Sequence, residues 1–119
     1  MDIQNKILVV DDEPGMREFL AAFFRAYEIP VLTAASAEDA LHLWETRASE
    51  IRAVVTDIVM PGMNGKALAE KLRMDRPELK IIFMSGYLPA EIAEEALDGV
   101  FFSKPFNPSD LLDAVQSGN

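Results

Sequence analysis

The sequence contains no cysteine, a single histidine and fewer basic than acidic residues. Without cysteine the chain can form neither a disulfide nor a thiolate metal site, which is compatible with a reducing cytoplasm. His42 has no ligand partners at a metal-binding spacing, so we expect a surface position and assign it no role. The 11 Lys and Arg residues against 20 Asp and Glu residues give a net charge of −9. Phosphate backbones and anionic membranes repel such a chain, so we expect this domain to bind proteins and cations, not nucleic acid or membranes.

The sequence also lacks a signal-like N-terminus and any apolar run long enough to span a bilayer, so we expect a cytoplasmic location. Its 119 residues, half of them hydrophobic, suffice for one core and leave no room for a second. We therefore expect one domain over residues 1–119, without an appended DNA-binding domain.

Five short apolar stretches predict β-strands, over residues 6–10, 30–34, 54–57, 80–84 and 100–103. The first, third and fourth are continuously apolar, which is typical of strands buried on both faces of a parallel sheet. Pro30 lacks an N–H group, so it favours an edge position for the second strand. Amphipathic stretches follow the strands and predict five helices, which indicates an α/β fold with helices on both faces of the sheet.

Helix starts are marked by Pro14, Ser36, Asn64 and Asn107. In the first helix, the residues at helical spacing that we expect to face the core are Met16, Phe19, Leu20, Phe23 and Tyr27. The fourth helix, over residues 88–97, is the weakest prediction because it is short and acidic.

Polar side chains stand where the predicted strands end, namely Asp11, Asp12, Asp57, Ser85 and Lys104. The carboxyl ends of parallel strands meet at one edge of the sheet, where ligands bind in open α/β folds. Taken singly, Asp57 is better explained as the residue that opens a turn, and Asp11, Asp12 and Glu13 as acidic residues that complement a helix dipole. Two neighbouring strands that both end in acid weaken these structural interpretations.

Three carboxylates brought together need a cation, and oxygen ligands without imidazole or thiolate suit Mg²⁺. Such an ion leaves positions open for phosphate oxygens, and Lys104 can hold a further one. The site therefore indicates phosphoryl transfer. A carboxylate can act as the nucleophile, which makes Asp57 the candidate for an aspartyl phosphate.

Four motifs resemble the signatures of bacterial response-regulator receiver domains: residues 9–13 (VVDDE), 56–62 (TDIVMPG), 84–86 (MSG) and 104–106 (KPF). The resemblance implies a flavodoxin-like fold of five βα units with strand order 2-1-3-4-5. It also implies a two-component system, in which a histidine kinase or phosphotransfer protein phosphorylates the domain and a downstream protein partner or attached domain responds. Residues 85–87 and 104–108 are most similar to receivers attached to hybrid sensor kinases, so the domain is compatible with a longer protein.

The resemblance assigns roles to individual residues. Asp57 is the expected phosphoacceptor, Asp12, Asp57 and the Val59 carbonyl are the expected Mg²⁺ ligands, and Asp11 assists through water. In the same way, Ser85 and Lys104 are expected to hold the phosphoryl group. Catalysis is limited to the domain's own phosphorylation and dephosphorylation, so we do not expect a classical enzyme.

The resemblance further implies a switch formed by Ser85 and Phe101, and a cis peptide bond between Lys104 and Pro105. Phe101 stands where many receivers have tyrosine, so the ring has no hydroxyl to anchor it outward, and we expect it to be partly inward before phosphorylation. The stretch between Ser85 and Lys104 is a few residues shorter than is usual in the family.

Two other functions fit parts of the pattern. One is a Mg²⁺-dependent phosphohydrolase with an Asp nucleophile, similar to the haloacid-dehalogenase-like enzymes. Those carry Asp-x-Asp on the first strand, whereas Asp11 and Asp12 are adjacent, and no cap that encloses a substrate is evident. The other is a degenerate receiver used only as a binding module, against which the intact set of acidic, hydroxyl and lysine side chains argues.

Overall fold

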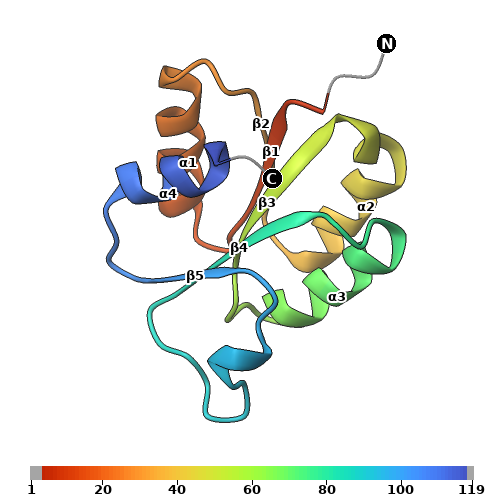
Figure 1. The fold of residues 1–119 in the computed structure, drawn as a ribbon, viewed down its shortest axis with the longest axis vertical. Coiled ribbons are helices and arrows are strands. Elements are labelled where there is room, and N and C mark those ends of the chain that lie inside the picture. The colour runs from red at the N-terminus through yellow and green to blue at the C-terminus, as the bar shows by residue number, and fades with distance from the viewer. Residues whose placement is uncertain (1–3, 118–119) are drawn as a thin grey trace.

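Five parallel strands form one sheet in the computed structural model of the protein, which describes residues 4–117 (Figure 1). The strands are β1 (Lys6–Val10), β2 (Val31–Ala34), β3 (Ile51–Asp57), β4 (Lys80–Ser85) and β5 (Val100–Ser103). Their order in the sheet is β2-β1-β3-β4-β5, and each pairing is parallel. The predicted fold class, strand order and edge position of the second strand are confirmed.

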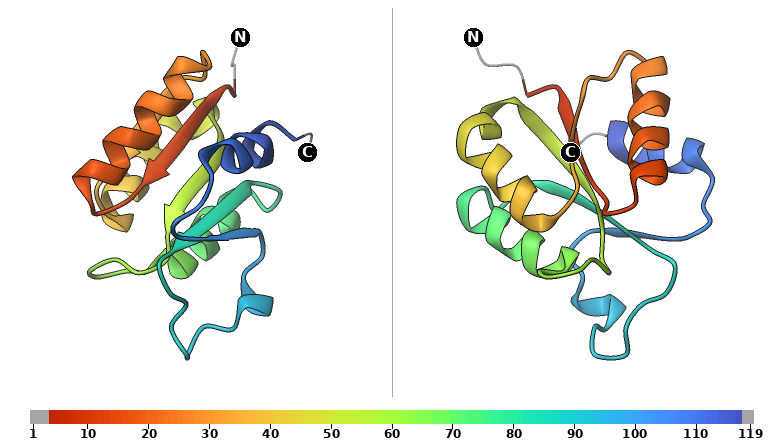
Figure 2. Two further views of the ribbon diagram at one scale, coloured as in Figure 1. Left: turned by 90° about the vertical axis from the view of Figure 1, so that its left-hand side faces the viewer. Right: turned by 180° about the vertical axis from the view of Figure 1, so that it is seen from behind.

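Helices cover both faces of the sheet. They are α1 (Pro14–Ala26), α2 (Ala37–Arg47), α3 (Gly65–Asp75) and α4 (Pro108–Gln116), with a short 3₁₀ turn, η1 (Ala48–Glu50), after α2. Helices α1 and α4 pack on one face, and α2 and α3 on the other (Figure 2). The predicted caps are present, because the side chains of Ser36, Asn64 and Asn107 accept backbone N–H groups of the helices that follow them. No helix within residues 4–117 is long and apolar enough to cross a membrane.

Alternate residues of each central strand supply the two layers of the core. In β1, Leu8 and Val10 face the α2 and α3 side, whereas Ile7 and Val9 face α1 and α4, and all four are fully buried. Continuous apolar runs in β1, β3 and β4 thus follow from burial on both faces.

The predicted core face of α1 is wrong in part. Phe19 is 49% exposed and Tyr27 is 53% exposed, whereas Leu20, Ala21 and Phe24 form the buried side. The helix carries more apolar residues than its packed face can hold, so helical spacing alone fits two overlapping stripes. The stripe that includes Ala21 allows the closer approach to the sheet, so Phe24 is buried with it while the Phe19 and Tyr27 rings remain outside.

The predicted fourth helix is absent from the described chain, which contains four α-helices and not five. In its place, two short turns are closed by Ile92 N–H to Pro89 carbonyl and Leu97 N–H to Glu94 carbonyl hydrogen bonds. The second turn is the 3₁₀ helix η2 (Glu94–Ala96). Between the two turns Ala93 is extended, with φ −78° and ψ 136°.

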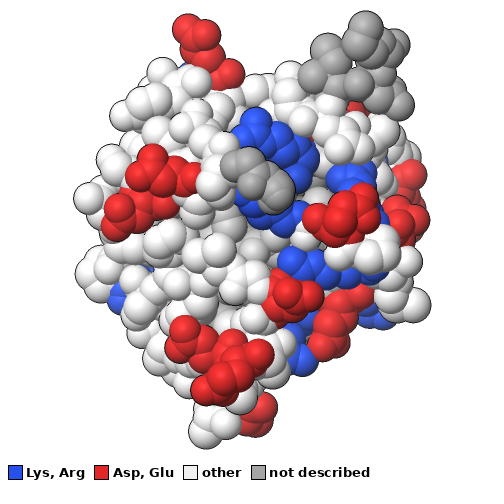
Figure 3. All heavy atoms as spheres, in the orientation of Figure 1, with Lys and Arg blue, Asp and Glu red and all other residues white. Residues whose placement is uncertain are grey.

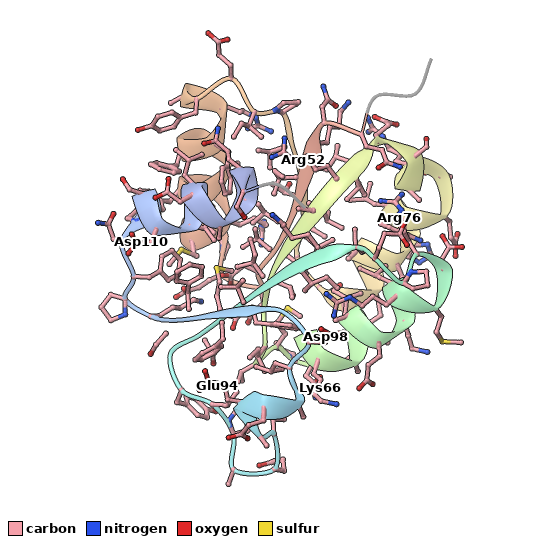
Figure 4. The ribbon with its side chains drawn as sticks, in the orientation of Figure 1. Arg52, Lys66, Arg76, Glu94, Asp98 and Asp110 are labelled. Atoms are coloured by element: carbon pink, nitrogen blue, oxygen red, sulfur yellow. The ribbon has the colours of Figure 1, made fainter. Side chains whose placement is uncertain are left out.

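Charge and length explain why residues 89–97 do not form a helix. Glu91 would lie one turn from both Glu94 and Glu95, and like charges at these spacings destabilise a helix. Acidic side chains gather over this segment at the lower end of the molecule (Figure 3). A helix of so few residues is marginal without strong tertiary support. The segment is instead anchored at its far end, where Arg73 of α3 donates to the Asp98 carbonyl (Figure 4).

Candidate functional site

The carboxyl edge of the sheet brings together the polar residues that the sequence places at strand ends. Asp11 follows β1, Asp57 ends β3, Ser85 ends β4 and Lys104 follows β5. Two backbone hydrogen bonds connect neighbouring strand ends at this edge, from Ile58 N–H to the Met84 carbonyl (2.9 Å) and from Lys104 N–H to the Ser85 carbonyl (2.7 Å). The site is therefore fixed by the sheet and not by flexible loops alone.

Three carboxylates form the centre of the site. Asp11, Asp12 and Asp57 each offer one oxygen, and these oxygens lie within 4.8 Å of one another. Asp11 is fully buried and Asp57 is 7% exposed, whereas Asp12 faces solvent. The cluster is thus closed on the protein side and open on one side to an ion or a substrate. A donor set of oxygens only, with one open side, fits Mg²⁺ that keeps several water positions.

Lys104 neutralises part of this charge. Its Nζ atom lies 3.1 Å from Asp57 Oδ2 and 3.3 Å from Asp11 Oδ2. Burial raises the pKa of Asp57, and Lys104 only partly opposes that rise. Burial alone would lower the pKa of Lys104, but the attraction of Asp57 and Asp11 outweighs it, so this pKa is raised. Lys104 is therefore held as a cation between two carboxylates.

The Ser85 hydroxyl is engaged away from the carboxylates. The side chain is 1% exposed, and its Oγ atom accepts the Tyr87 N–H (3.3 Å) and donates to the Tyr87 carbonyl. Ser85 thus lies at the predicted edge, but its hydroxyl is turned into the loop that follows β4. Reaching a group bound at Asp57 requires the hydroxyl to leave both contacts with Tyr87.

Phe101 is partly buried and packs against the core cluster under α2 and α3. Its backbone pairs with Phe83 in the neighbouring strand β4, two residues before Ser85. The ring is therefore partly covered by the core, and its part in a switch stays a prediction. The Lys104–Pro105 peptide bond is cis, as the resemblance implied.

The loop after β3 holds Asp57 through close backbone contacts. Val59 N–H donates to Asp57 Oδ1 at 3.3 Å, and Gly65 N–H donates to the Ile58 carbonyl at 2.9 Å. A Cβ atom on Gly65 would lie 2.2 Å from the Asp57 carbonyl oxygen, so only glycine lets α3 begin against the end of β3. Gly62 adopts φ 78°, in the left-handed region that glycine tolerates.

Arg17 is a site residue that the sequence did not reveal. Its Nη1 atom donates to the Asp11 carbonyl at 2.8 Å, across the turn that leads into α1. An arginine one turn into a helix that follows an acidic pair is the available signal, but many surface arginines share it.

His42 is exposed and lines a hollow of about 520 Å³ beside the edge strand β2, together with Thr33, outside the acidic cluster.

The sequence model of one protein family, the response regulator receiver domain, matches residues 7–116 of the chain. The chain belongs to this family. Among curated relatives, the receiver is 35% identical over 114 residues to the sensor kinase CckA of Brucella abortus, a match that covers 92% of this chain and 12% of that protein. The chain likewise spans only 25% of the regulatory protein DctD of Pseudomonas aeruginosa.

Solved receiver structures share the fold. A response regulator receiver protein from Pseudomonas putida has a TM-score of 0.85 and 30% identity, with 99% of this chain and 100% of that chain covered. The response regulator TrrA from Thermotoga maritima, solved in complex with Mg²⁺ and BeF, has a TM-score of 0.79 and 32% identity, with 93% and 96% covered.

Membership establishes the general function. The chain is a receiver domain of two-component signalling, and receiver domains are signalling phosphoacceptors that bind Mg²⁺ at an acidic pocket. The phosphohydrolase and the degenerate receiver are not favoured by these relatives.

Proposed function

We propose that Asp57 accepts a phosphoryl group from the phosphohistidine of a histidine kinase or phosphotransfer protein. The observation that carries this proposal is that Asp57 lies in the carboxylate cluster, 3.1 Å from the Lys104 ammonium, and keeps some exposure to solvent, whereas Asp11, which also contacts Lys104, is fully buried. A carboxylate oxygen of Asp57 attacks phosphorus, the P–N bond to the donor histidine breaks, and the imidazole leaves with the bonding electrons and takes up a proton. The product is an aspartyl phosphate.

The acidic residues would hold the metal ion for this transfer. Asp12, Asp57 and the Val59 carbonyl are the proposed ligands of Mg²⁺, with Asp11 assisting through water. Bound Mg²⁺ neutralises charge on the phosphoryl oxygens. Lys104 already lies beside Asp57, so its ammonium can pass from the carboxylates to a phosphoryl oxygen without a long movement.

Ser85 and Phe101 are the residues through which phosphorylation at Asp57 is proposed to change the surface of the domain. When the Ser85 hydroxyl donates to a phosphoryl oxygen, it releases the Tyr87 backbone and therefore the start of the segment 86–99. Because Phe101 is already partly inward, we expect its ring to settle further and the adjoining surface to change modestly. A downstream protein or an attached domain would bind the changed surface.

The phosphodonor would dock along α1. Phe19, Phe23 and Tyr27 form an aromatic stripe in which Phe19 and Tyr27 are exposed and Phe23 is partly buried against the core. The ring centroids lie 6.3 Å apart for Phe19 and Phe23 and 5.2 Å apart for Phe23 and Tyr27. The helix starts at Pro14, directly after the acidic residues, so a protein seated on the stripe would lie along the helix that begins at the acidic site. Exposed aromatic side chains are typical of protein interfaces.

Labelling with acetyl phosphate and Mg²⁺ tests the phosphoacceptor. We expect the wild-type chain to incorporate one phosphoryl group and Asp57→Asn to incorporate none. Asp113→Asn, which alters an exposed carboxylate on α4, is the control and should label like the wild type. Full labelling of Asp57→Asn would contradict the assignment.

A further inference from the structure

The turn between β1 and α1 is held at two points. Arg17 Nη1 donates to the Asp11 carbonyl at 2.8 Å, and the Glu13 N–H donates to Asp11 Oδ1 at 2.9 Å. Asp11 is fully buried while its neighbour Asp12 faces solvent, yet their carboxylates reach the same cluster. Neighbouring residues of an extended strand point to opposite faces, so this convergence depends on the bend that follows Val10.

We propose that Arg17 is a positioning residue for the metal site. By fixing the Asp11 carbonyl, its guanidinium holds the bend in which Asp11 and Asp12 both direct a carboxylate toward Asp57. Arg17 touches no ligand oxygen of the cluster and acts through the backbone alone. The inference rests on the proposed Mg²⁺ site, and it adds a residue that the acidic motif does not contain.

The direction in which Mg²⁺ affinity changes when Arg17 is removed distinguishes a positioning role from a purely electrostatic one. A guanidinium near the cluster repels a divalent cation, so if Arg17 acted only through its charge, removing it would tighten Mg²⁺ binding. If Arg17 positions the acidic pair, removing it weakens binding, because groups that orient metal ligands are worth about 10- to 100-fold in affinity. The two roles therefore predict changes in opposite directions.

Arg25 provides a matched control on the same helix. Its Nη2 atom donates to the Val31 carbonyl at 3.3 Å, and donor and acceptor residues are six apart in sequence, as they are for Arg17 and Asp11. Arg25 lies about 12 Å further along the helix axis than Arg17, away from the acidic turn. Losing either contact loosens one link between α1 and the sheet, but only Arg17 contacts the acidic turn.

The experiment compares Arg17→Met and Arg25→Met, in which the apolar stem is largely kept and both the charge and the donor are lost. Mg²⁺ is titrated into each full-length variant, and the amide shifts of Asp12 and Val59 are followed by NMR. We expect the Kd to rise about tenfold in Arg17→Met. In Arg25→Met we expect it to stay near the wild-type value, while both variants lose similar thermal stability. Without metal, the Glu13 amide should exchange faster with solvent in Arg17→Met only.

Three results would overturn the proposal while leaving the metal site intact. They are an unchanged or lower Kd in Arg17→Met, an equal rise in both variants, and unchanged exchange of the Glu13 amide. A wild-type protein that shows no Mg²⁺-dependent shifts would overturn both the metal site and the role of Arg17. The failure of the present inference is thus distinguishable from failure of the proposed function.

Discussion

Lys104 Nζ lies 3.1 Å from Asp57 Oδ2, although the strands that carry these residues, β5 and β3, are separated in the sheet by β4. The same ammonium lies 3.3 Å from Asp11, so one cation serves two buried carboxylates. The site keeps a net negative charge in this state. That charge makes the edge of the sheet receptive to a second cation.

Lys104→Met should destabilise the protein, because it leaves two buried carboxylates facing each other. We expect the free energy of unfolding in metal-free buffer to fall by about 3 kcal/mol, as when one partner of a buried ion pair is removed. Saturating Mg²⁺ should restore much of the loss by replacing the missing charge. Urea denaturation with and without Mg²⁺ measures both effects, and a variant as stable as the wild type without metal would contradict the bridging role.

Asp57→Asn should stabilise the metal-free protein near neutral pH. The pKa of Asp57 is raised by burial, so the folded protein binds this proton more readily than the unfolded chain does. The ionised group therefore costs stability above its folded pKa, and that cost disappears as the pH falls toward the ordinary value of about 3.9. We expect a gain in the free energy of unfolding at pH 7 that shrinks toward zero near pH 4. A gain that grows as the pH falls would have the wrong sign, and Asp113→Asn is the control.

Magnesium should raise the stability of the folded protein through the acidic cluster. At a concentration about ten times its Kd, Mg²⁺ should add about 1.4 kcal/mol to the free energy of unfolding. Removal with EDTA should reverse the gain, and Asp12→Asn should reduce it. Because the chain carries a net charge of −9, NaCl at equal ionic strength is the control for general screening. Equal stabilisation by both salts would argue against a specific site.

Phe19→Glu should slow phosphotransfer from a phosphorylated histidine protein by about tenfold, since exposed aromatic residues often dominate interface energetics. Labelling by acetyl phosphate should not change, because the small donor needs no docking surface. Met74→Glu, at an 85% exposed position on α3, serves as the control. Loss of both reactions in Phe19→Glu would point to a damaged fold and not to docking.

Beryllofluoride with Mg²⁺ should perturb the NMR signals around Ser85, Tyr87 and Phe101, because the Ser85 hydroxyl exchanges its Tyr87 contacts for the bound group. The Phe101 ring starts partly inward, so its shift changes should be modest. Ser85→Ala should abolish the changes at Phe101 while those at Asp57 persist. A full outward-to-inward swing of the ring would refute the partly inward starting state.

The sequence predicted which residues meet at the edge of the sheet better than it predicted the exposure and contacts of side chains at the surface. Apolar runs that end in Asp11 and Asp57 specify buried parallel strands, and parallel strands bring their ends together whatever the details of packing. The orientation of the Ser85 hydroxyl and the contact of Arg17 depend on neighbours distant in space, and no local pattern encodes them. The exposure of Phe19 depends on which of two stripes approaches the sheet most closely.

Ala93 has implications for how this architecture can change over evolutionary time. Its φ of −78° already lies in the helical range, so rotating ψ from 136° by about half a turn would remove the extended residue between the two turns. The ψ angle of Ala93 is therefore one of the torsions that must change before this segment can become a helix. Substitutions that neutralise Glu91, Glu94 and Glu95 would remove the like-charge repulsion that opposes a helix in this segment, while the sheet and its catalytic edge stay intact.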